Sequence, residues 1–423
     1  MEVKEEVMRF SGSSVKGIVT PPPSKSHTHR AFFLSSLSQD ECRIYNSLNS
    51  QDTQATLSAV KAMGSKVRRS CCNILMKGSG LHAPSGVVDA ENSGTTMRIF
   101  TGIASMFDVP VTITGDASLR TRPMGPLLDA LTEMNVKCSS DNGTAPVTVC
   151  GPNRGGNVNI LGSISSQFVS SLMITAPMLS DDTKIQINGN LSSRPYVDIT
   201  KNMMERFGAS VLFDKDRITV CGGTGYTGCD ITVPSDLSSA AFPLTAGALS
   251  GSVTVRNIDM NDPQGDKRIV DILRDAGAHA DVSGDEITSS PGELKGIDVN
   301  MGDIPDLFPI VAVLLSTAKG KSRLHGAPQL RFKESDRIGS TVSMLKALGA
   351  KIEGTDDGCV IEGVKRLNGG TIEHHGDHRI LMAAAVASLV CKNEVTMNRS
   401  DCYAVSYPLF LEHMKRLGLN TEA

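Results

Sequence analysis

The sequence predicts an α/β protein of two domains, each built of three βαβαββ repeat units. Three observations predict this fold: a length of 423 residues, a repeat period of about seventy residues, and incomplete repeat units at both ends of the chain. A chain of this length exceeds what a single hydrophobic core usually serves, so more than one domain is expected.

The composition is that of an ordinary globular protein, with 40% hydrophobic residues, 21% charged residues and a formal net charge of -3. This charge argues against a nucleic-acid partner. The start of the sequence lacks the apolar segment of a signal peptide, and the longest apolar run is too short to span a bilayer. Ten cysteines without CxxC spacing indicate reduced thiols. We therefore expect a cytoplasmic protein without a membrane partner.

Two series of sequence markers define the repeat. In six segments polar residues directly precede an apolar helical run, at spacings of 68 to 73 residues; the segments begin at Ser24, Asn92, Ser165, Ser235, Asp303 and Gly376. Six amphipathic helices end in a glycine or asparagine, which indicates a left-handed C-cap. These end residues recur every 69 to 73 residues, at Gly64, Asn135, Gly208, Gly277, Gly349 and Gly418. Because the two series are in phase, they predict six copies of one unit.

Short strands of alternating polarity complete the unit, as in "GGNVNILG", "GCDITVP" and "GIDVNMG". The first unit lacks a leading strand unless "RFSGSSVKGIVT" supplies it, and the last unit ends after its helix at Gly418. Both termini are therefore expected in one domain. Turn-forming residues near 19–21 and 233–235 predict where the chain crosses between domains. One domain then spans 20–233, the other is discontinuous (1–19 and 234–423), and the two hinge strands permit closure.

The helix starts carry cations that capping does not explain. Serine, asparagine and aspartate are ordinary N-caps, whereas a cation in the first turn opposes the helix dipole by up to about 1 kcal/mol. Such cations are Lys25, Arg30, Arg98 and Arg379, and further cations stand in loops before helices, at Arg120, Arg122, Arg331, Lys333 and Arg337. An anionic ligand would offset their cost. We therefore expect an active site in the cleft between the two domains.

Seven motifs together resemble the 5-enolpyruvylshikimate-3-phosphate synthase family, in order and over nearly the whole chain: "PPPSKSHTHR", "ENSGTTMRIF", "SLRTRPMGPLLDAL", "SSQFVSSLMITAP", "DIPDLFP", "RFKESDR" and "GDHRILMA". The resemblance implies two inside-out α/β barrel-like domains of three βαβαββ units. It implies transfer of the enolpyruvyl group of phosphoenolpyruvate to the 5-hydroxyl of shikimate 3-phosphate, with release of phosphate. This reaction is a step of the shikimate pathway to chorismate and the aromatic amino acids. A monomer without cofactor or metal is expected.

The resemblance also implies the site residues. The implied ligands of shikimate 3-phosphate are Lys25, Ser26, Arg30, Ser165, Ser166, Gln167, Ser193, Tyr196, Asp306, Gln329 and Lys333. The implied ligands of phosphoenolpyruvate are Lys25, Asn92, Gly94, Arg122, Gln167, Arg337 and Arg379. The catalytic set is Asp306 as base, Glu334 as acid, and Lys25; Lys25 and Lys333 are alternative proton donors.

Two positions depart from the family pattern. Gln329 stands where the family often has asparagine, and Val405 stands where many members carry a phosphate-binding lysine. Gln329 has the same hydrogen-bonding groups as asparagine, so it is expected to serve as a ligand. Without the late lysine, the phosphate must be held by Lys25 and the arginines.

Alternative interpretations remain at this stage. A sister transferase that acts on UDP-N-acetylglucosamine usually carries a loop cysteine, which "GDASLRTRPMGPLL" lacks. A metal-dependent hydrolase would need His374 and His378 on one helix, but the helix is expected to start near Asp377. An RNA-phosphate binder would need more aromatics than the 4% present. For single residues, Asp306 is alternatively a helix cap and Glu334 an ordinary acid of a first helical turn.

Overall fold

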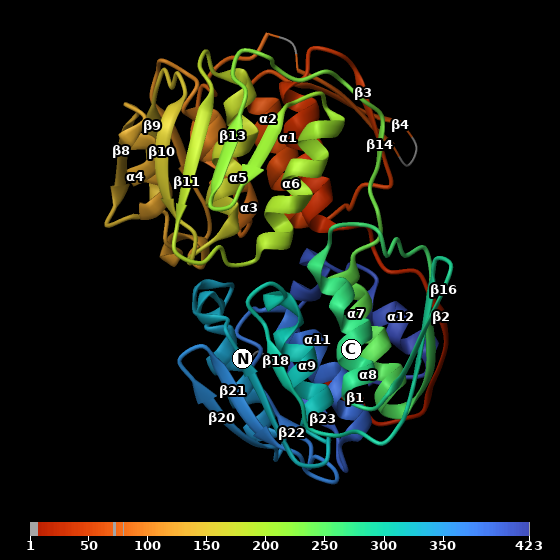
Figure 1. Ribbon diagram of the computed structural model, residues 1–423. Helices are drawn as coiled ribbons and strands as arrows, with labels where there is room; N and C mark the ends of the chain where they lie inside the picture. Colours follow the sequence, from red (N-terminus) through yellow and green to blue (C-terminus); the bar gives the residue numbers. More distant parts are fainter. Residues whose placement is uncertain (1–6, 71–72, 79, 423) are drawn as a thin grey trace, which may run out of the picture. The chain divides into compact units, whose positions relative to one another are not determined.

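A computed structural model describes residues 7–70, 73–78 and 80–422, and the chain divides into two compact units (Figure 1). Unit 1 comprises Met1–Pro22 and Pro234–Ala423, and unit 2 comprises Pro23–Val233. The adjacent Cys71 and Cys72 lie outside the described residues. The other eight cysteines are free thiols. In the described part of the chain, no helix is both long and apolar enough to cross a membrane.

The protein has a mixed α/β fold with several sheets. Across the described residues there are six four-stranded sheets, three in each unit. All six have the same strand senses: one pair of neighbouring strands at an edge of the sheet is parallel, and the other two neighbouring pairs are antiparallel. In unit 2 the sheet orders are β14-β3-β5-β4, β6-β7-β9-β8 and β10-β11-β13-β12. In unit 1 they are β16-β17-β15-β2, β18-β19-β21-β20 and β22-β23-β1-β24. The parallel pair comes last in the first of these three orders and first in the other two.

The elements of unit 2 follow one another in chain order from α1 to β14. Its helices are α1 (Lys25–Leu37), α2 (Gln51–Ala62), α3 (Gly94–Ala104), η1 (Leu119–Thr121), α4 (Gly125–Glu133), α5 (Ser166–Thr175), η2 (Ala176–Met178) and α6 (Arg194–Arg206). Its strands are β3 (Cys42–Tyr45), β4 (Lys66–Ser70), β5 (Asn73–Lys77), β6 (Val88–Asp89), β7 (Val111–Thr114), β8 (Lys137–Asp141), β9 (Thr144–Cys150), β10 (Gly156–Leu161), β11 (Thr183–Asn188), β12 (Val211–Asp214), β13 (Arg217–Val220) and β14 (Ile231–Thr232).

Unit 1 takes its elements from both ends of the chain. Its helices are α7 (Leu237–Ser250), η3 (Gly265–Arg268), α8 (Ile269–Asp275), η4 (Pro305–Leu307), α9 (Phe308–Leu315), η5 (Pro328–Phe332), α10 (Arg337–Ala347), α11 (His378–Ala387), η6 (Ser388–Val390), η7 (Cys402–Val405) and α12 (Phe410–Leu417). Its strands are β1 (Val7–Ser11), β2 (Val15–Val19), β15 (Gly251–Val255), β16 (His279–Ser283), β17 (Glu286–Ser290), β18 (Asp298–Asn300), β19 (Lys321–His325), β20 (Lys351–Thr355), β21 (Gly358–Glu362), β22 (Gly370–Thr371), β23 (Val395–Asn398) and β24 (Asn420–Glu422).

The leading strand of the first sheet comes from the end of unit 2 that is distant in the sequence. The sequence left open whether "RFSGSSVKGIVT" supplies this strand, and its strand β2 pairs in parallel with β15, in unit 1. Strand β14, from "GCDITVP", instead pairs in parallel with β3 and leads the first sheet of unit 2. The sequence left this point open because the sheet that a strand joins depends on the path of the chain between the units.

The helix ends are as predicted. All six predicted end residues have positive φ angles, from 63° at Asn135 to 111° at Gly418. Glycine and asparagine adopt this left-handed conformation at little cost, so they end the helices where the sequence placed the markers. At the other end, serine or aspartate side chains accept N-cap hydrogen bonds in seven of the described helices: Ser24 (α1), Ser50 (α2), Ser93 (α3), Ser165 (α5), Asp236 (α7), Asp336 (α10) and Asp377 (α11).

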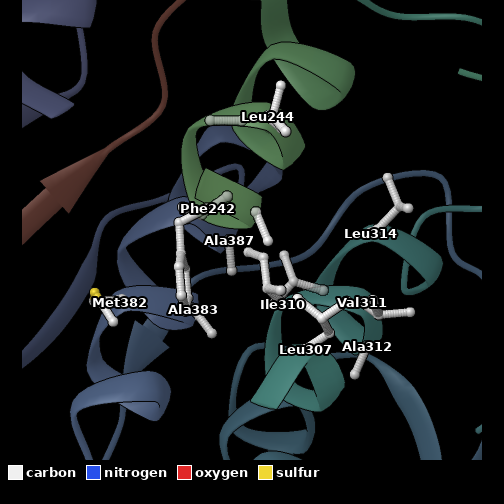
Figure 2. Close-up of a cluster of buried hydrophobic side chains, with 14 of the residues drawn as sticks. Phe242, Leu244, Leu307, Ile310, Val311, Ala312, Leu314, Met382, Ala383 and Ala387 are labelled. Atoms are coloured by element: carbon white, nitrogen blue, oxygen red, sulfur yellow. The ribbon is translucent and has the colours of Figure 1, made fainter. Parts of the chain in front are cut away.

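Three apolar helices form the centre of unit 1. Every residue of α9 and α11 is buried, as is α7 from Leu237 to Ala248. Figure 2 shows side chains of the three helices gathered in one cluster, among them Phe242 of α7, Ile310 of α9 and Ala383 of α11. A helix that is apolar on all sides must be covered on all sides. Sheets lie outside these helices in Figure 1, and this packing fixes the helix starts at which the predicted site residues stand.

Candidate functional site

Lys25 is the first residue of α1, directly after its N-cap Ser24. Its Nζ lies 2.9 Å from Oδ2 of Asp52, which is in the first turn of α2. Both side chains are largely buried. Asp52 therefore compensates a cation that the helix dipole disfavours. Sequence reasoning gave Asp52 no role, because an acid in a first helical turn is unremarkable in a sequence.

Arg30 is buried one turn further along α1, and only 2% of it is exposed. Its Nε donates to Oγ1 of Thr200 at 2.7 Å, and its terminal nitrogens donate to the carbonyl oxygens of Ser26 and Tyr196, each at 3.0 Å. Burial lowers the pKa of Arg30 to about 10. These neutral partners tie α1 to α6, so the contacts favour a positioning role; direct contact with shikimate 3-phosphate stays a prediction.

The α3 cluster consists of Asn92, Gly94, Arg98, Arg122 and Gln167. Arg122 is 5% exposed and donates to Oδ1 of Asn92 at 2.7 Å and to its carbonyl oxygen at 3.3 Å. Nη1 of Arg98 donates to Oε1 of Gln167 at 2.6 Å. The structure therefore brings the four predicted ligands of this group together and adds Arg98, to which the sequence analysis assigned no ligand role.

Gly94 opens α3 between the two guanidinium groups. A Cβ atom added there would lie 3.3 Å from Nη1 of Arg98 and 3.4 Å from Nη1 of Arg122. Glycine thus keeps side-chain atoms out of the space that both arginines border, and the N-terminus of the 11-residue helix α3 adds partial positive charge. The arrangement suits an anion held against the backbone.

The remaining predicted ligands of unit 2 stand at the starts of α5 and α6. Ser165 is the N-cap of α5, and its hydroxyl accepts from the backbone N–H of Gln167 at 3.3 Å. Ser166 is the first residue of that helix. Ser193 precedes α6 with a φ of 58°, and its side chain makes no capping hydrogen bond. The capping explanation therefore holds for Ser165 and does not hold for Ser193.

The Arg337 cluster in unit 1 consists of Asp306, Glu334, Arg337, Asp377 and Arg379. Arg337 is 1% exposed and forms ion pairs with three carboxylates: Asp377 through Nε at 3.0 Å, Asp306 through Nη1 at 3.0 Å, and Glu334 through Nη2. Burial disfavours its charge, but Asp377, Glu334 and Asp306 outweigh burial and raise the pKa of the guanidinium. Arg337 is thus held charged and in place.

Asp306 joins the two arginines of this cluster. Its Oδ1 accepts from Arg337 at 3.0 Å, and its Oδ2 accepts from Nη2 of Arg379 at 2.9 Å. Burial raises the pKa of Asp306, but Arg379, Lys333 and Arg337 outweigh burial and hold the pKa of this carboxyl well below its usual range. The helix-cap alternative is wrong, because the N-cap of η4 is Ile304 and no side chain caps that helix.

Glu334 precedes α10 instead of lying in its first turn. The N-cap of α10 is Asp336, and the first helical residue is Arg337. The alternative that Glu334 is an ordinary first-turn acid is therefore wrong. Glu334 forms an ion pair with Arg337 instead.

Asp377 is the member of the cluster that sequence reasoning left without a role. It is fully buried, pairs with Arg337 and caps α11 by accepting from the backbone N–H of Arg379 at 2.9 Å. The motif "GDHR" shows only the cap, because a capping aspartate gives no sign of a second partner.

Gln329 lies on η5, near the Arg337 cluster in the sequence. It is 4% exposed, and its Nε2 donates to the carbonyl oxygen of Gly302 at 3.0 Å. Its Oε1 is buried without a hydrogen-bond partner among the described residues. One polar atom of this predicted ligand is therefore available for a ligand group. Val405 ends η7 and is partly exposed.

The geometry that the hydrolase alternative required is not found. Helix α11 begins at His378, after the N-cap Asp377, so His374 is not on the same helix. This confirms the expected helix start. In the described part of the chain, no group of three or more His, Cys, Asp or Glu residues could hold a metal ion.

A hollow of about 590 Å³ lies in unit 1, away from the Arg337 cluster. Its lining includes Ala248 at the end of α7, Ala318 after α9, and Leu389 after α11. The Arg337 cluster stands at the starts of these helices, so the hollow is at their opposite ends. None of the predicted site residues lines it.

These observations define an α/β enzyme in which buried arginines and paired carboxylates stand at helix starts. The family model for EPSP synthase (3-phosphoshikimate 1-carboxyvinyltransferase) matches residues 11–414. The chain belongs to the EPSP synthase family.

Individual relatives agree with the family match. A 3-phosphoshikimate 1-carboxyvinyltransferase of Methanocorpusculum labreanum is 48% identical over 96% of this chain and 97% of its own length. One of Methanocella arvoryzae is 41% identical over 98% of this chain and 100% of its own. A solved structure of EPSP synthase from Acinetobacter baumannii matches with a TM-score of 0.81 at 28% identity, covering 99% of this chain and 100% of that one.

Proposed function

We propose that this protein is a 3-phosphoshikimate 1-carboxyvinyltransferase of the shikimate pathway. It transfers the enolpyruvyl group of phosphoenolpyruvate to the 5-hydroxyl of shikimate 3-phosphate and releases phosphate, in the synthesis of chorismate and the aromatic amino acids. The UDP-N-acetylglucosamine alternative is not favoured, because the family model and the relatives carry the shikimate activity in their names.

The observation that carries the proposal is the Arg337 cluster. Two buried arginines there hold three side-chain carboxylates. The carboxylate of an incoming phosphorylated substrate can therefore replace one of these side chains as the partner of an arginine. Arginine is suited to such exchange, because its planar fork binds carboxylate and phosphate groups alike. The exchange releases Asp306 and Glu334, the two residues to which we assign proton transfer.

The proposed roles draw on both units. Shikimate 3-phosphate is assigned to Lys25, Ser26, Arg30, Ser165, Ser166, Gln167, Ser193, Tyr196, Asp306, Gln329 and Lys333. Phosphoenolpyruvate is assigned to Lys25, Asn92, Gly94, Arg122, Gln167, Arg337 and Arg379. Asp306 is the base at the 5-hydroxyl and Glu334 the acid at the methylene carbon, and Lys25 is the third catalytic residue. Lys25 and the arginines hold the phosphate that a lysine at position 405 would otherwise contact.

We infer that each unit consists of three βαβαββ repeats with the helices inside and the sheets outside. The shared strand senses of the six sheets support this inference. We also propose that the units act as two domains, and that the chain near 22–23 and 233–234 serves as two hinges, since the division into units falls there. We also propose a monomer in the cytoplasm; the eight free thiols are consistent with a reducing compartment.

Phosphate release tests the proposed reaction. We expect release only when shikimate 3-phosphate and phosphoenolpyruvate are both present, because the phosphate leaves after the enolpyruvyl group has been added to the hydroxyl. Excess chelator should not change the rate. A comparable rate with phosphoenolpyruvate alone would identify a phosphatase and exclude the transferase.

Arg122→Ala tests the phosphoenolpyruvate assignment. Loss of one charge-assisted hydrogen bond costs about 1.5–3 kcal/mol, so the KM for phosphoenolpyruvate should rise at least about tenfold. The matched control is Arg120→Ala, because Arg120 is exposed and its Nε donates to the carbonyl oxygen of Gly115. Steady-state kinetics with both variants decide the matter: equal KM values for the two variants would remove Arg122 from the site.

A further inference from the structure

Four hydrogen-bonded side chains form a continuous line through the interior of unit 2. They are His29 on α1, Thr56 on α2, Thr96 on α3 and Ser93, the N-cap of α3, and none of them is exposed. Nδ1 of His29 lies 2.7 Å from Oγ1 of Thr56, which lies 2.6 Å from Oγ1 of Thr96. The Thr96 hydroxyl donates to Oγ of Ser93 at 2.7 Å. We call this set the His29 line.

The protons along the His29 line run in one direction. Each hydroxyl has a single proton. With the Thr96 proton directed to Ser93, Thr56 must donate to Thr96, and His29 must then donate from Nδ1 to Thr56. Burial, Lys25 and Arg30 hold the pKa of His29 well below its usual range, so the ring is neutral and its Nε2 carries no proton. This agrees with Nε2 being buried without a partner among the described residues.

The His29 line joins the helices that begin with Lys25 and Gly94. His29 is one turn after Lys25 on α1, and Ser93 directly precedes Gly94 on α3. Between them, α2 carries both Thr56 and Asp52, and Asp52 binds Lys25 at 2.9 Å through its side chain. The Thr96 hydroxyl also lies 3.4 Å from the carbonyl oxygen of Asp52. The Thr56–Thr96 bond therefore lies on the hydrogen-bonded path between Lys25 and Gly94.

We propose that Thr56 and Thr96, with His29, are positioning residues for phosphoenolpyruvate. They set the spacing between the Lys25 ammonium group and the backbone at Gly94, without touching the substrate. The proposal rests on the proposed function, which assigns Lys25 and Gly94 to this substrate. It also predicts selectivity, because phosphoenolpyruvate is assigned to both Lys25 and Gly94, whereas shikimate 3-phosphate is assigned to Lys25 but to no residue of α3.

Thr56→Val tests the proposal, since it keeps the shape of the side chain and removes the hydroxyl. Loss of one buried hydrogen bond should raise the KM for phosphoenolpyruvate about five- to tenfold and that for shikimate 3-phosphate less than about twofold. Thr56→Ser restores the hydroxyl and should return both values to within about twofold of the wild type. The KM values are measured together with Tm.

The matched control is Thr101→Val. Thr101 is equally buried on α3, but its hydroxyl donates within its own helix, to the carbonyl oxygen of Met97 at 2.7 Å. We expect Thr101→Val to lower Tm and leave both KM values unchanged. If Thr56→Val lowers Tm to the same extent and also leaves both KM values unchanged, the hydroxyl only stabilises the core and the proposal is wrong. If the proposed function itself is wrong, the wild-type protein will release no phosphate with both substrates present. This result distinguishes failure of the proposed function from failure of the positioning proposal.

The tautomer of His29 gives a test that needs no variant. Nitrogen-15 NMR of the imidazole in the wild-type protein should show a neutral ring protonated at Nδ1 between pH 6 and 8. A ring protonated at Nε2 would reverse the direction of the protons and overturn the proposed line, even if Thr56→Val fails to fold.

Discussion

Asp306→Asn is expected to abolish addition of phosphoenolpyruvate to the 5-hydroxyl while the protein stays folded. The amide cannot accept the hydroxyl proton, and one positioned base typically contributes about 10²–10⁴-fold. The rate of phosphate release should therefore fall at least about a hundredfold. The amide oxygen can still accept a hydrogen bond from Arg379 or Arg337, so binding of shikimate 3-phosphate should change little. Single-turnover phosphate release and equilibrium binding measure the two effects separately.

The electrostatics of Asp306 bear on the base role that we propose for it. Burial raises its pKa, but Arg379, Lys333 and Arg337 outweigh burial and hold the pKa well below the usual range, which makes the carboxylate a weak base. An anion bound by Arg337 and Arg379 would take over their charge. The pKa of Asp306 would then rise towards the range in which a carboxylate accepts a proton. Phosphoenolpyruvate would thus activate the base for its own addition.

The same shift makes a prediction about stability. Because the pKa of Asp306 is lowered on folding, its ionised form stabilises the protein above the unfolded pKa of about 3.9, and this contribution is lost as the pH falls towards the folded pKa. Asp306→Asn should therefore lower Tm at pH 7, and the difference from the wild type should narrow below about pH 4.

The matched control for Asp306 is Asp303→Asn, three residues earlier. Asp303 is exposed and is not a member of the Arg337 cluster, whereas Asp306 joins both arginines of that cluster. The control should retain the activity of the wild type and a similar Tm. Wild-type turnover by Asp306→Asn would show that another group removes the hydroxyl proton.

Helix starts and ends could be read from the sequence because they depend on local chemistry. A glycine or asparagine in the left-handed conformation and a capping serine or aspartate fix a helix end through contacts within a few residues. The pairing partner of a strand, in contrast, is not set by local chemistry. Ile231 of β14 pairs with Ile44 of β3, and Val15 of β2 pairs with Gly251 of β15, so the sheet that each strand joins depends on a distant part of the chain.

The site shows the same division between local and distant information. Arg98 was visible as a first-turn cation that helix capping does not explain, and Arg122 as a cation in a loop before a helix, whereas Gly94 was implied by the resemblance to the family. Asp52 and Asp377 were not visible, because their ordinary positions at helix starts conceal their pairing with Lys25 and Arg337. Arg30 stood out as an unexplained cation, yet its partners are neutral groups on α5 and α6. Partners across helices are set by packing, which the sequence does not display.

Glu334→Gln is expected to stop proton transfer to the methylene carbon of phosphoenolpyruvate. The methylene group becomes a methyl group during addition and loses a proton again as phosphate leaves, so a reversible acid should exchange its hydrogens with solvent. Glutamine keeps an oxygen that can accept from Arg337 but has no transferable carboxyl proton. In D₂O with both substrates present, deuterium exchange into the methylene group should fall about 10²–10⁴-fold. Binding of shikimate 3-phosphate should change far less.

The comparison that isolates this role is Glu362→Gln in the same unit. Glu362 is exposed and pairs with Lys351 at 2.9 Å. Glu362→Gln therefore removes the ion pair of a glutamate that is not a member of the Arg337 cluster. It should leave exchange at the wild-type rate. Glu334→Gln can affect exchange in two ways: by loss of the acid, or by loosening Arg337 and weakening substrate binding. Saturating phosphoenolpyruvate separates them, because it restores a binding defect and cannot restore a missing proton donor. Exchange at the wild-type rate in Glu334→Gln would transfer the role of acid to Lys25 or Lys333.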